Sequence, residues 1–255
     1  MLLINMTDVP KSHPRYKSLI LRERLVEGFR TGVVVPQGLI AHGRGEMFDY
    51  LIGERTIKEA RLASKAAAAV MLAAKRPVIS VNGNVAALCP EEVVRLARAT
   101  KARIEVGLFH RTDERVSKIV KILEDNGAED VLGFLPDEAI PGIDHMRGIC
   151  SKAGIYYADV VLVPLEDGDR VNALGQMGKK TIAIDLNPMS RTSRTATITI
   201  VDEVTRAVPE LILNVEDLSD DPAARKRSIV SYDRDKNLAA VAENMSKSLK
   251  SFLKR

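Results

Sequence analysis

The chain has 255 residues, of which 45% are hydrophobic, and this is enough for the core of one large α/β domain. Its 38 basic and 34 acidic residues are interleaved, so the net charge of +4 does not form the block of like charge typical of a nucleic-acid-binding arm. The longest apolar run, residues 66–74, is too short to cross a bilayer, and the N-terminus lacks the pattern of a signal peptide. We therefore expect a cytoplasmic protein.

The first 75 residues are expected to form a mainly helical segment. Residues 16–31 have the periodicity of an amphipathic helix, because Leu21, Leu25 and Phe29 recur every four residues. Arg22 borders this apolar stripe, from which its side chain can aim into a cleft or extend to solvent. A capping box at residues 56–59 predicts the start of a helix that runs to about residue 74.

Residues 39–47 place two glycines around Arg44, with His42 two positions before it. Glycine permits tight turns and a close approach of the backbone to a ligand, and arginine offers a fork of donors that fits phosphate or carboxylate. This stretch is therefore interpreted either as a turn with a solvated arginine or as an anion-binding loop.

From residue 77 onward, short apolar runs alternate with helical patterns. This alternation favours a Rossmann-like, mostly parallel sheet with helices on both faces, and we expect residues 1–255 to form one α/β domain. A polar loop is predicted at residues 215–227, and the end of the chain is predicted to be a helix. The predicted strands are residues 78–81, 103–106, 131–134, 159–163, 181–184 and 196–201, and the predicted helices are those from residue 90, 114–124, 169–177, 202–213 (capped by Asp202) and 237–254.

Polar residues follow several of these strands, at the edge where parallel sheets bind ligands. Asn82 and Asn84 follow the first strand, where they form either an ordinary turn or a ligand contact. Residues 185–195 combine Asp185 with two arginines and several hydroxyl groups, which suits ribose and phosphate, although a solvated loop is the alternative. Residues 175–180 fit a helix C-cap better than a phosphate-binding loop.

The standard motifs for nucleotide and metal sites are missing from the sequence. Residues 173–180 lack the first glycine and the hydroxyl residue of a P-loop, and residues 43–48 lack the third glycine of a dinucleotide fingerprint. The two cysteines, Cys89 and Cys150, have no metal-ligand spacing and are expected to be inert thiols. Any nucleotide site must therefore be of another kind.

Residues 10–16, 38–46 and 48–56, together with residues 80–84 and 185–195, resemble the archaeal 4-phosphopantoate–β-alanine ligase family, also called phosphopantothenate synthetase. The resemblance spans nearly the whole chain and is weakest after about residue 215. It implies an ATP-dependent homodimer that joins 4-phosphopantoate and β-alanine into 4'-phosphopantothenate in coenzyme A biosynthesis. AMP and pyrophosphate would be released, and Mg²⁺ would accompany ATP.

The resemblance also implies the residues of the site. An acyl-adenylate mechanism gathers negative charge, which fixed arginines would stabilise, and no protein ligand to a metal is predicted. Family members often carry asparagine where this chain has Glu203. The candidate catalytic residues are Arg44 and His42, the ATP contacts are Arg22, Arg44, Asp185, Leu186, Asn187, Arg191, Thr192, Glu203 and Val204, and the candidates for substrate binding are Lys11, His13, Arg15 and Asn84.

Two other functions stay open at this point. A kinase or phosphatase that acts on a small phosphorylated acid would use the same arginines, and its products would distinguish it from a ligase. Nucleic-acid binding is suggested by a pI near 9.0 and a lysine-rich C-terminus, but the interleaved charges and the scarcity of aromatic residues oppose it.

Overall fold

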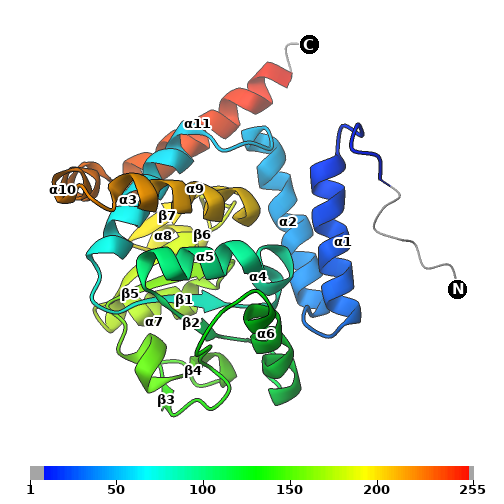
Figure 1. The fold of residues 1–255 in the computed structure, drawn as a ribbon. Helices are drawn as coiled ribbons and strands as arrows, with labels where there is room; N and C mark the ends of the chain where they lie inside the picture. The colour runs from blue at the N-terminus through cyan, green and yellow to red at the C-terminus, as the bar shows by residue number, and fades with distance from the viewer. Residues whose placement is uncertain (1–8, 253–255) are drawn as a thin grey trace, which may run out of the picture.

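The structure is a computed structural model that describes residues 9–252. An open sheet lies at its centre, with helices packed on it (Figure 1). The strands of this sheet are β1 (Pro77–Val81), β2 (Arg103–Val106), β5 (Val160–Pro164), β6 (Lys180–Ile184) and β7 (Ile198–Ile200). The helices are α1 (Tyr16–Arg30), α2 (Pro36–Ile52), α3 (Lys58–Ala73), α4 (Gly83–Leu88), α5 (Pro90–Thr100), α6 (Asp113–Asp125), α7 (Gly168–Gln176), α8 (Arg191–Thr195), α9 (Val204–Leu218), α10 (Pro222–Ser231) and α11 (Arg234–Phe252).

The five strands are all parallel and lie in the order β2-β1-β5-β6-β7. This confirms the predicted α/β architecture. The order is that of a doubly wound sheet in which the chain moves outward from β1 in both directions, so the switch point lies between β1 and β5. A crevice is expected outside the carboxyl ends of these two strands.

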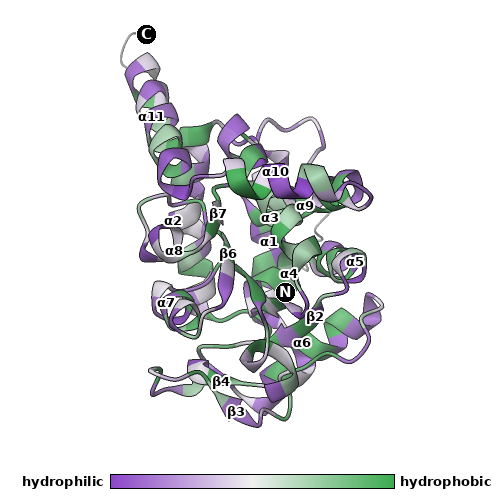
Figure 2. Ribbon diagram, turned by 90° about the vertical axis from the view of Figure 1, so that its left-hand side faces the viewer, coloured by the Kyte–Doolittle hydropathy of each residue, from purple (hydrophilic) through white to green (hydrophobic). Residues whose placement is uncertain are grey.

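Alternate residues of each strand face two separate cores. In β5, Val160 and Leu162 pack with α3, α5 and α9 in the larger core, whereas Val161 and Val163 face the smaller one with α7. In Figure 2 the helices around the sheet carry both hydrophilic and hydrophobic residues. Both faces of the sheet are therefore covered, as continuous apolar strands require.

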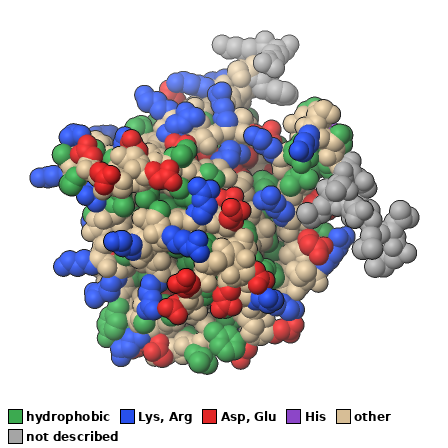
Figure 3. Space-filling model, in the orientation of Figure 1, with side chains coloured by type: hydrophobic (Ala, Val, Ile, Leu, Met, Phe, Trp, Pro, Cys, Tyr) green, Lys and Arg blue, Asp and Glu red, His purple; other side chains and the backbone are tan. Residues whose placement is uncertain are grey.

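The N-terminal and C-terminal helices extend this core on one side. Helix α1 packs against α4, and α2 packs against α11, so the predicted N-terminal helical segment and C-terminal helix are both present. In the described residues no helix is long and apolar enough to cross a membrane. Basic and acidic side chains are mixed over the face in Figure 3. Cys89 and Cys150 are buried free thiols.

Four sequence predictions were wrong at the level of elements. Residues 131–134 form only an isolated bridge, from Leu132 to Glu105, and not a strand. Most of the predicted loop at residues 215–227 is helical, because α9 continues to Leu218 and Asp221 caps α10 with its side chain. A short hairpin of β3 (Glu138–Ala139) and β4 (Ile149–Cys150) was not predicted. The expected capping box is also absent, as Thr56 donates instead to Asp202 (2.6 Å).

Candidate active site

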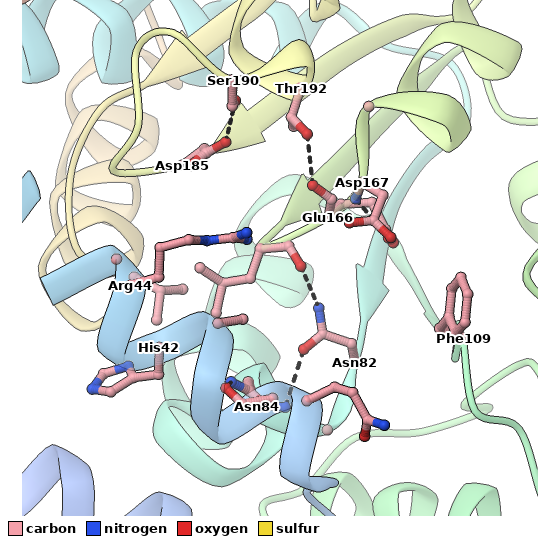
Figure 4. A pocket seen from close by; sticks show the side chains of 18 of the residues that line it. His42, Arg44, Asn82, Asn84, Phe109, Glu166, Asp167, Asp185, Ser190 and Thr192 are labelled. Atoms are coloured by element: carbon pink, nitrogen blue, oxygen red, sulfur yellow. Dashed lines mark hydrogen bonds between the residues drawn. The ribbon is translucent and has the colours of Figure 1, made fainter. Parts of the chain in front are cut away.

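A cavity of about 580 Å³ opens at the carboxyl ends of the parallel strands, beside helix α2 (Figure 4). Every strand of the sheet contributes the segment that follows it. The lining segments are residues 107–110 after β2, 82–84 after β1, 165–169 after β5, 185–187 after β6 and 203–204 after β7. The cavity therefore crosses the switch point and continues to both sides of it.

Arg44 reaches this cavity from a helix and not from a loop. The predicted turn at residues 39–47 lies inside α2, which begins at Pro36 and ends at Gly53 in the left-handed conformation (φ 79°). Figure 4 shows the Arg44 guanidinium extending into the cavity toward the segment that carries Glu166. It makes no ion pair with any described residue, so its donors are available to an anionic ligand.

Helix α2 comes close to the start of helix α4 because one of its residues is glycine. A Cβ at Gly38 would lie 2.2 Å from Oδ1 of Asn84, so no larger residue fits there. Asn84 in turn donates from Nδ2 to the Gly38 carbonyl (2.9 Å) and lines the cavity. Asn82 caps α4 through Oδ1 and donates to the carbonyls of Pro164 and Leu165, which joins β1 to β5. The expected turn at residues 82–84 is thus the start of a helix.

The segment after β6 is ordered by its own hydroxyl and carboxylate groups. Asp185 accepts from the amide of Asn187 (2.9 Å) and from the hydroxyl of Ser190, and burial raises the pKa of Asp185. Thr192 donates to the Glu166 carbonyl (2.7 Å), which ties α8 to the end of β5. Arg191 is exposed and pairs with Asp169 at the rim. The structure therefore places Asp185, Leu186, Asn187, Arg191 and Thr192 on the cavity wall.

Glu203 and Val204 form the wall after β7. Glu203, and not Asp202 as predicted, caps α9, because its carboxylate accepts from the amide of Thr205 (2.8 Å). Its side chain is only 6% exposed, and burial raises its pKa. Asp202 instead accepts from Nε of Arg206 (2.9 Å).

Two predicted residues lie beside the cavity and do not face its centre. Arg22 on α1 lies outside it and donates from Nε and Nη2 to Glu46 of α2 (2.7 Å at the closest). The imidazole of His42 points away from Arg44 (Figure 4). Burial lowers the pKa of His42, and its Nε2 has no hydrogen-bond partner among the described residues.

A second hollow of about 300 Å³ lies on the far side of His42. It shares His42, Leu186 and Glu203 with the main cavity, so the two spaces adjoin. Lys11, His13 and Arg15, which were predicted as substrate contacts, line this second hollow and not the main one. Asn84, the fourth residue predicted to bind substrate, lines the main cavity instead.

Three buried arginines were not predicted from the sequence: Arg115, Arg147 and Arg170. Arg115 and Arg147 line the cavity, and Arg170 lies behind it, fully buried and bound to Glu166 (2.9 Å). One signal for Arg115 was available, since it precedes Ile119 and Leu123 by four and eight residues and so occupies the apolar stripe of its helix. A charged residue on such a stripe is either paired or functional.

The carboxylates of the site do not suit a metal held by the protein. Within residues 9–252, no group of three or more His, Cys, Asp or Glu side chains is arranged to hold a metal ion. Glu166 and Asp167 are both paired with Arg147, and Asp169 is paired with Arg191. The carboxylates that follow β5 therefore act as counterions of arginines.

The chain is similar to known proteins over most of its length. Residues 59–248 match the family model described as phosphopantothenate/pantothenate synthetase. Proteins named 4-phosphopantoate–β-alanine ligase are similar over most of their length: the one from Methanosarcina mazei is 52% identical over 96% of this chain and 97% of its own, and the one from Thermococcus kodakarensis is 52% identical over 92% and 91%. A third, from Methanospirillum hungatei, is 56% identical over 84% and 87%. The chain belongs to the phosphopantothenate/pantothenate synthetase family.

Proposed function

We propose that the protein is an ATP-dependent ligase that joins 4-phosphopantoate and β-alanine to form 4'-phosphopantothenate, a step of coenzyme A biosynthesis. The names of three relatives at 52–56% identity support this reaction. The observation that carries the proposal is the convergence on one cavity of residues far apart in the sequence: Arg44 from α2, Asp185 and Arg191 around α8, and Glu203 before α9.

The reaction proceeds in two steps. A carboxylate oxygen of the acid attacks the α-phosphorus of ATP, pyrophosphate leaves, and an acyl-adenylate forms. The amine nitrogen of β-alanine then attacks the acyl carbon, loses a proton and expels AMP. Both steps place negative charge on phosphate or acyl oxygens, which correctly placed cationic donors stabilise.

The residues divide between these tasks. Arg44 and Arg191 bind the phosphates of ATP, and Arg22 joins them after exchanging Glu46 for phosphate. Asp185, Leu186 and Asn187 hold the ribose, while Thr192, Glu203 and Val204 complete the nucleotide wall. His42 accepts the proton of the amine or donates a hydrogen bond. Mg²⁺ is carried by the phosphates of ATP, because the described side chains offer it no cluster of ligands.

We also propose the domain organisation, location and oligomeric state of the protein. The whole chain acts as one catalytic domain in the cytoplasm, forms a homodimer and binds only small molecules. Light scattering on the purified protein measures the dimer, and a mass of 28.0 kDa would show a monomer.

Product analysis tests the reaction. Purified protein is incubated with ATP, Mg²⁺, β-alanine and 4-phosphopantoate whose carboxyl oxygens carry a heavy isotope. The proposal requires 4'-phosphopantothenate, pyrophosphate and AMP that contains one heavy oxygen, because the attacking carboxylate oxygen leaves with AMP. Formation of ADP, or heavy oxygen in inorganic phosphate, would show phosphoryl transfer and overturn the acyl-adenylate route.

A further inference from the structure

Arg115 is a buried cation without a counterion. It lies in the first turn of α6 and is 9% exposed. Its Nε donates to the carbonyl of Val33 (2.8 Å) and its Nη1 to the carbonyl of His110 (2.9 Å). No carboxylate among residues 9–252 lies within ion-pair distance of it, and burial lowers its pKa. Since a guanidinium stays protonated in proteins, the positive charge remains.

A buried charge of this kind is unfavourable unless something neutralises it. Backbone carbonyls satisfy two of the three nitrogens of Arg115, and Nη2 makes no hydrogen bond to a described residue. Arg115 lines the main cavity, so a bound anion can reach the guanidinium there. The site is therefore complete only when a ligand brings negative charge.

A second guanidinium is held beside the same loop. Arg147 lies over the ring of Phe109 (5.2 Å from its Cζ to the ring centroid), and Phe109 directly precedes His110, the residue that holds Arg115. Glu166 and Asp167 fix Arg147 in place, and its side chain is 10% exposed. Both terminal nitrogens of Arg147 are thus bound to carboxylates, of which Asp167 is exposed at the cavity and can give way to a bound anion.

The strand order puts Arg115 far from the proposed nucleotide wall, while Arg147 is bound to the carboxylates that follow the central strand β5. Residues 107–110 follow β2 and Arg115 follows in α6, whereas the proposed ATP contacts follow β6 and β7. With strands about 4.8 Å apart, β2 lies about 10 Å from β5 on one side, and β7 lies about 10 Å from β5 on the other. An acid whose carboxyl group meets ATP near β5 would extend its far end toward β2.

We propose that Arg115, together with Arg147, binds the phosphate group of the acid substrate and makes the enzyme select a phosphorylated acid over its unphosphorylated form. The inference rests on the proposed ligase function and identifies the subsite that this function requires. A dianionic phosphate monoester would accept from the Nη2 of Arg115, which no described residue binds, and would replace the exposed carboxylate of Asp167 on Arg147. Leu108 and Phe109 offer an apolar wall for the short carbon chain between phosphate and carboxyl.

The main test is substrate discrimination by Arg115→Lys. We expect the KM for 4-phosphopantoate to rise about 10- to 100-fold, the scale of a lost hydrogen bond to a charged group, while the KM for ATP stays within about twofold. The ratio of kcat/KM for 4-phosphopantoate to that for pantoate should fall by a similar factor. If Arg115 had a purely structural role, the substitution would lower kcat/KM for 4-phosphopantoate and for pantoate by the same factor, and their ratio would not change.

Arg111→Lys is the matched control. Arg111 belongs to the same loop and also donates to two backbone carbonyls, those of Gly133 (2.6 Å) and Phe134, but it does not line the cavity. Its ratio should equal that of the wild type. Arg147→Lys is a second test that does not depend on the folding of Arg115→Lys, because Arg147 is held by different contacts, namely two carboxylates and a ring. It should also lower the ratio of kcat/KM for 4-phosphopantoate to that for pantoate.

A binding measurement separates this inference from the ligase proposal. With α,β-methylene ATP filling the nucleotide half, inorganic phosphate should raise the melting temperature of the wild type and not that of Arg115→Lys or Arg147→Lys. If the wild type makes no phosphopantothenate, the ligase proposal fails while this readout still tests the subsite. An unchanged discrimination ratio in both variants, or its loss in Lys11→Gln instead, would overturn the inference.

Discussion

The Arg44 side chain is exposed, and its position on helix α2 directs it into the cavity. Its side chain makes no ion pair within residues 9–252, and it extends from helix α2 into the cavity (Figure 4). We expect Arg44→Ala to lower ligase turnover by about 100-fold, the typical effect of losing one placed donor to transition-state charge. Steady-state kinetics measure this loss, and circular dichroism checks that the variant remains folded.

The matched control for this change is Arg61→Ala. Arg61 is also an exposed helical arginine, but it lies on α3, away from the cavity. Its removal should leave turnover within about twofold of the wild type, on the usual scale of surface substitutions. Equal turnover of the two variants would remove Arg44 from the site.

The burial of Glu203 makes the free energy of unfolding depend on pH. Burial raises the pKa of Glu203 above its usual value of 4.5. Folding therefore favours the neutral carboxyl more than the unfolded chain does, and this stabilising contribution is lost as pH rises through the raised pKa. Glu203→Gln keeps an oxygen acceptor for the amide of Thr205 but carries no charge.

We accordingly expect Glu203→Gln to match the wild type in the free energy of unfolding near pH 4 and to exceed it near pH 7. Urea denaturation across this range measures the difference. The control is Glu243→Gln, because the hydrogen bond from Lys247 lowers the pKa of Glu243 and reverses the sign. If the stability advantage of Glu203→Gln over the wild type became smaller as pH rises, burial would not raise the pKa of Glu203 as described.

At the scale of elements, one carboxylate joins three segments of the fold. Glu166, at the end of β5, pairs with Arg170 of α7 and with Arg147 beside the β3–β4 hairpin, and its side chain is 3% exposed. Glu166→Gln would leave the fully buried Arg170 without its ion-pair partner, and Arg147 would keep only Asp167. We expect the free energy of unfolding to fall by about 3–5 kcal/mol, as when one partner of a buried ion pair is removed.

Asp169→Asn is the comparison for Glu166→Gln. Asp169 also follows β5 and pairs with an arginine, but both side chains of that pair are more than half exposed. Exposed pairs contribute about 0–1 kcal/mol, so this variant should unfold almost like the wild type. Urea denaturation of both ligand-free variants decides, and equal stability would show that the buried cluster does not hold the hairpin to α7.

These elements also show what a sequence can predict. The strands were predicted because each is a short apolar run between helical patterns, and four of the six predicted runs match β1, β2, β5 and β6 closely. Helix α2 was missed because its glycines indicate a turn locally, whereas its contact with Asn84 requires a small residue on a helix. Helix α10 was missed because it buries no residue and so has no apolar stripe to detect.

The site itself could be predicted only in part. The segments after β6 and β7 were found from their residue types and from a family resemblance, and the structure brings them to one cavity. Arg147 lies in a stretch with no periodic pattern, and its role depends on contacts with Glu166 and Phe109 that only the folded chain creates. Long-range contacts of this kind leave no local signal in a sequence.

For the whole molecule, the strand order decides how the substrates can share one cavity. The site runs across the carboxyl ends of all five strands, with β1 and β5 at its centre. The proposed nucleotide contacts lie toward β7, and the proposed phosphate subsite lies toward β2. Two ligands placed in this way meet only at their reacting ends, so neither should exclude the other.

Ligand-induced stabilisation tests this arrangement of the whole site. A ligand that binds only the folded state stabilises it by about 2.7 kcal/mol at a concentration of about 100 times its Kd. We expect α,β-methylene ATP and 4-phosphopantoate to stabilise the protein additively, by about 5 kcal/mol together at those concentrations. Urea denaturation with each ligand alone and with both measures the sum. If the second ligand adds nothing to the first, the two compete for one subsite, and the division of the cavity along the strand order is wrong.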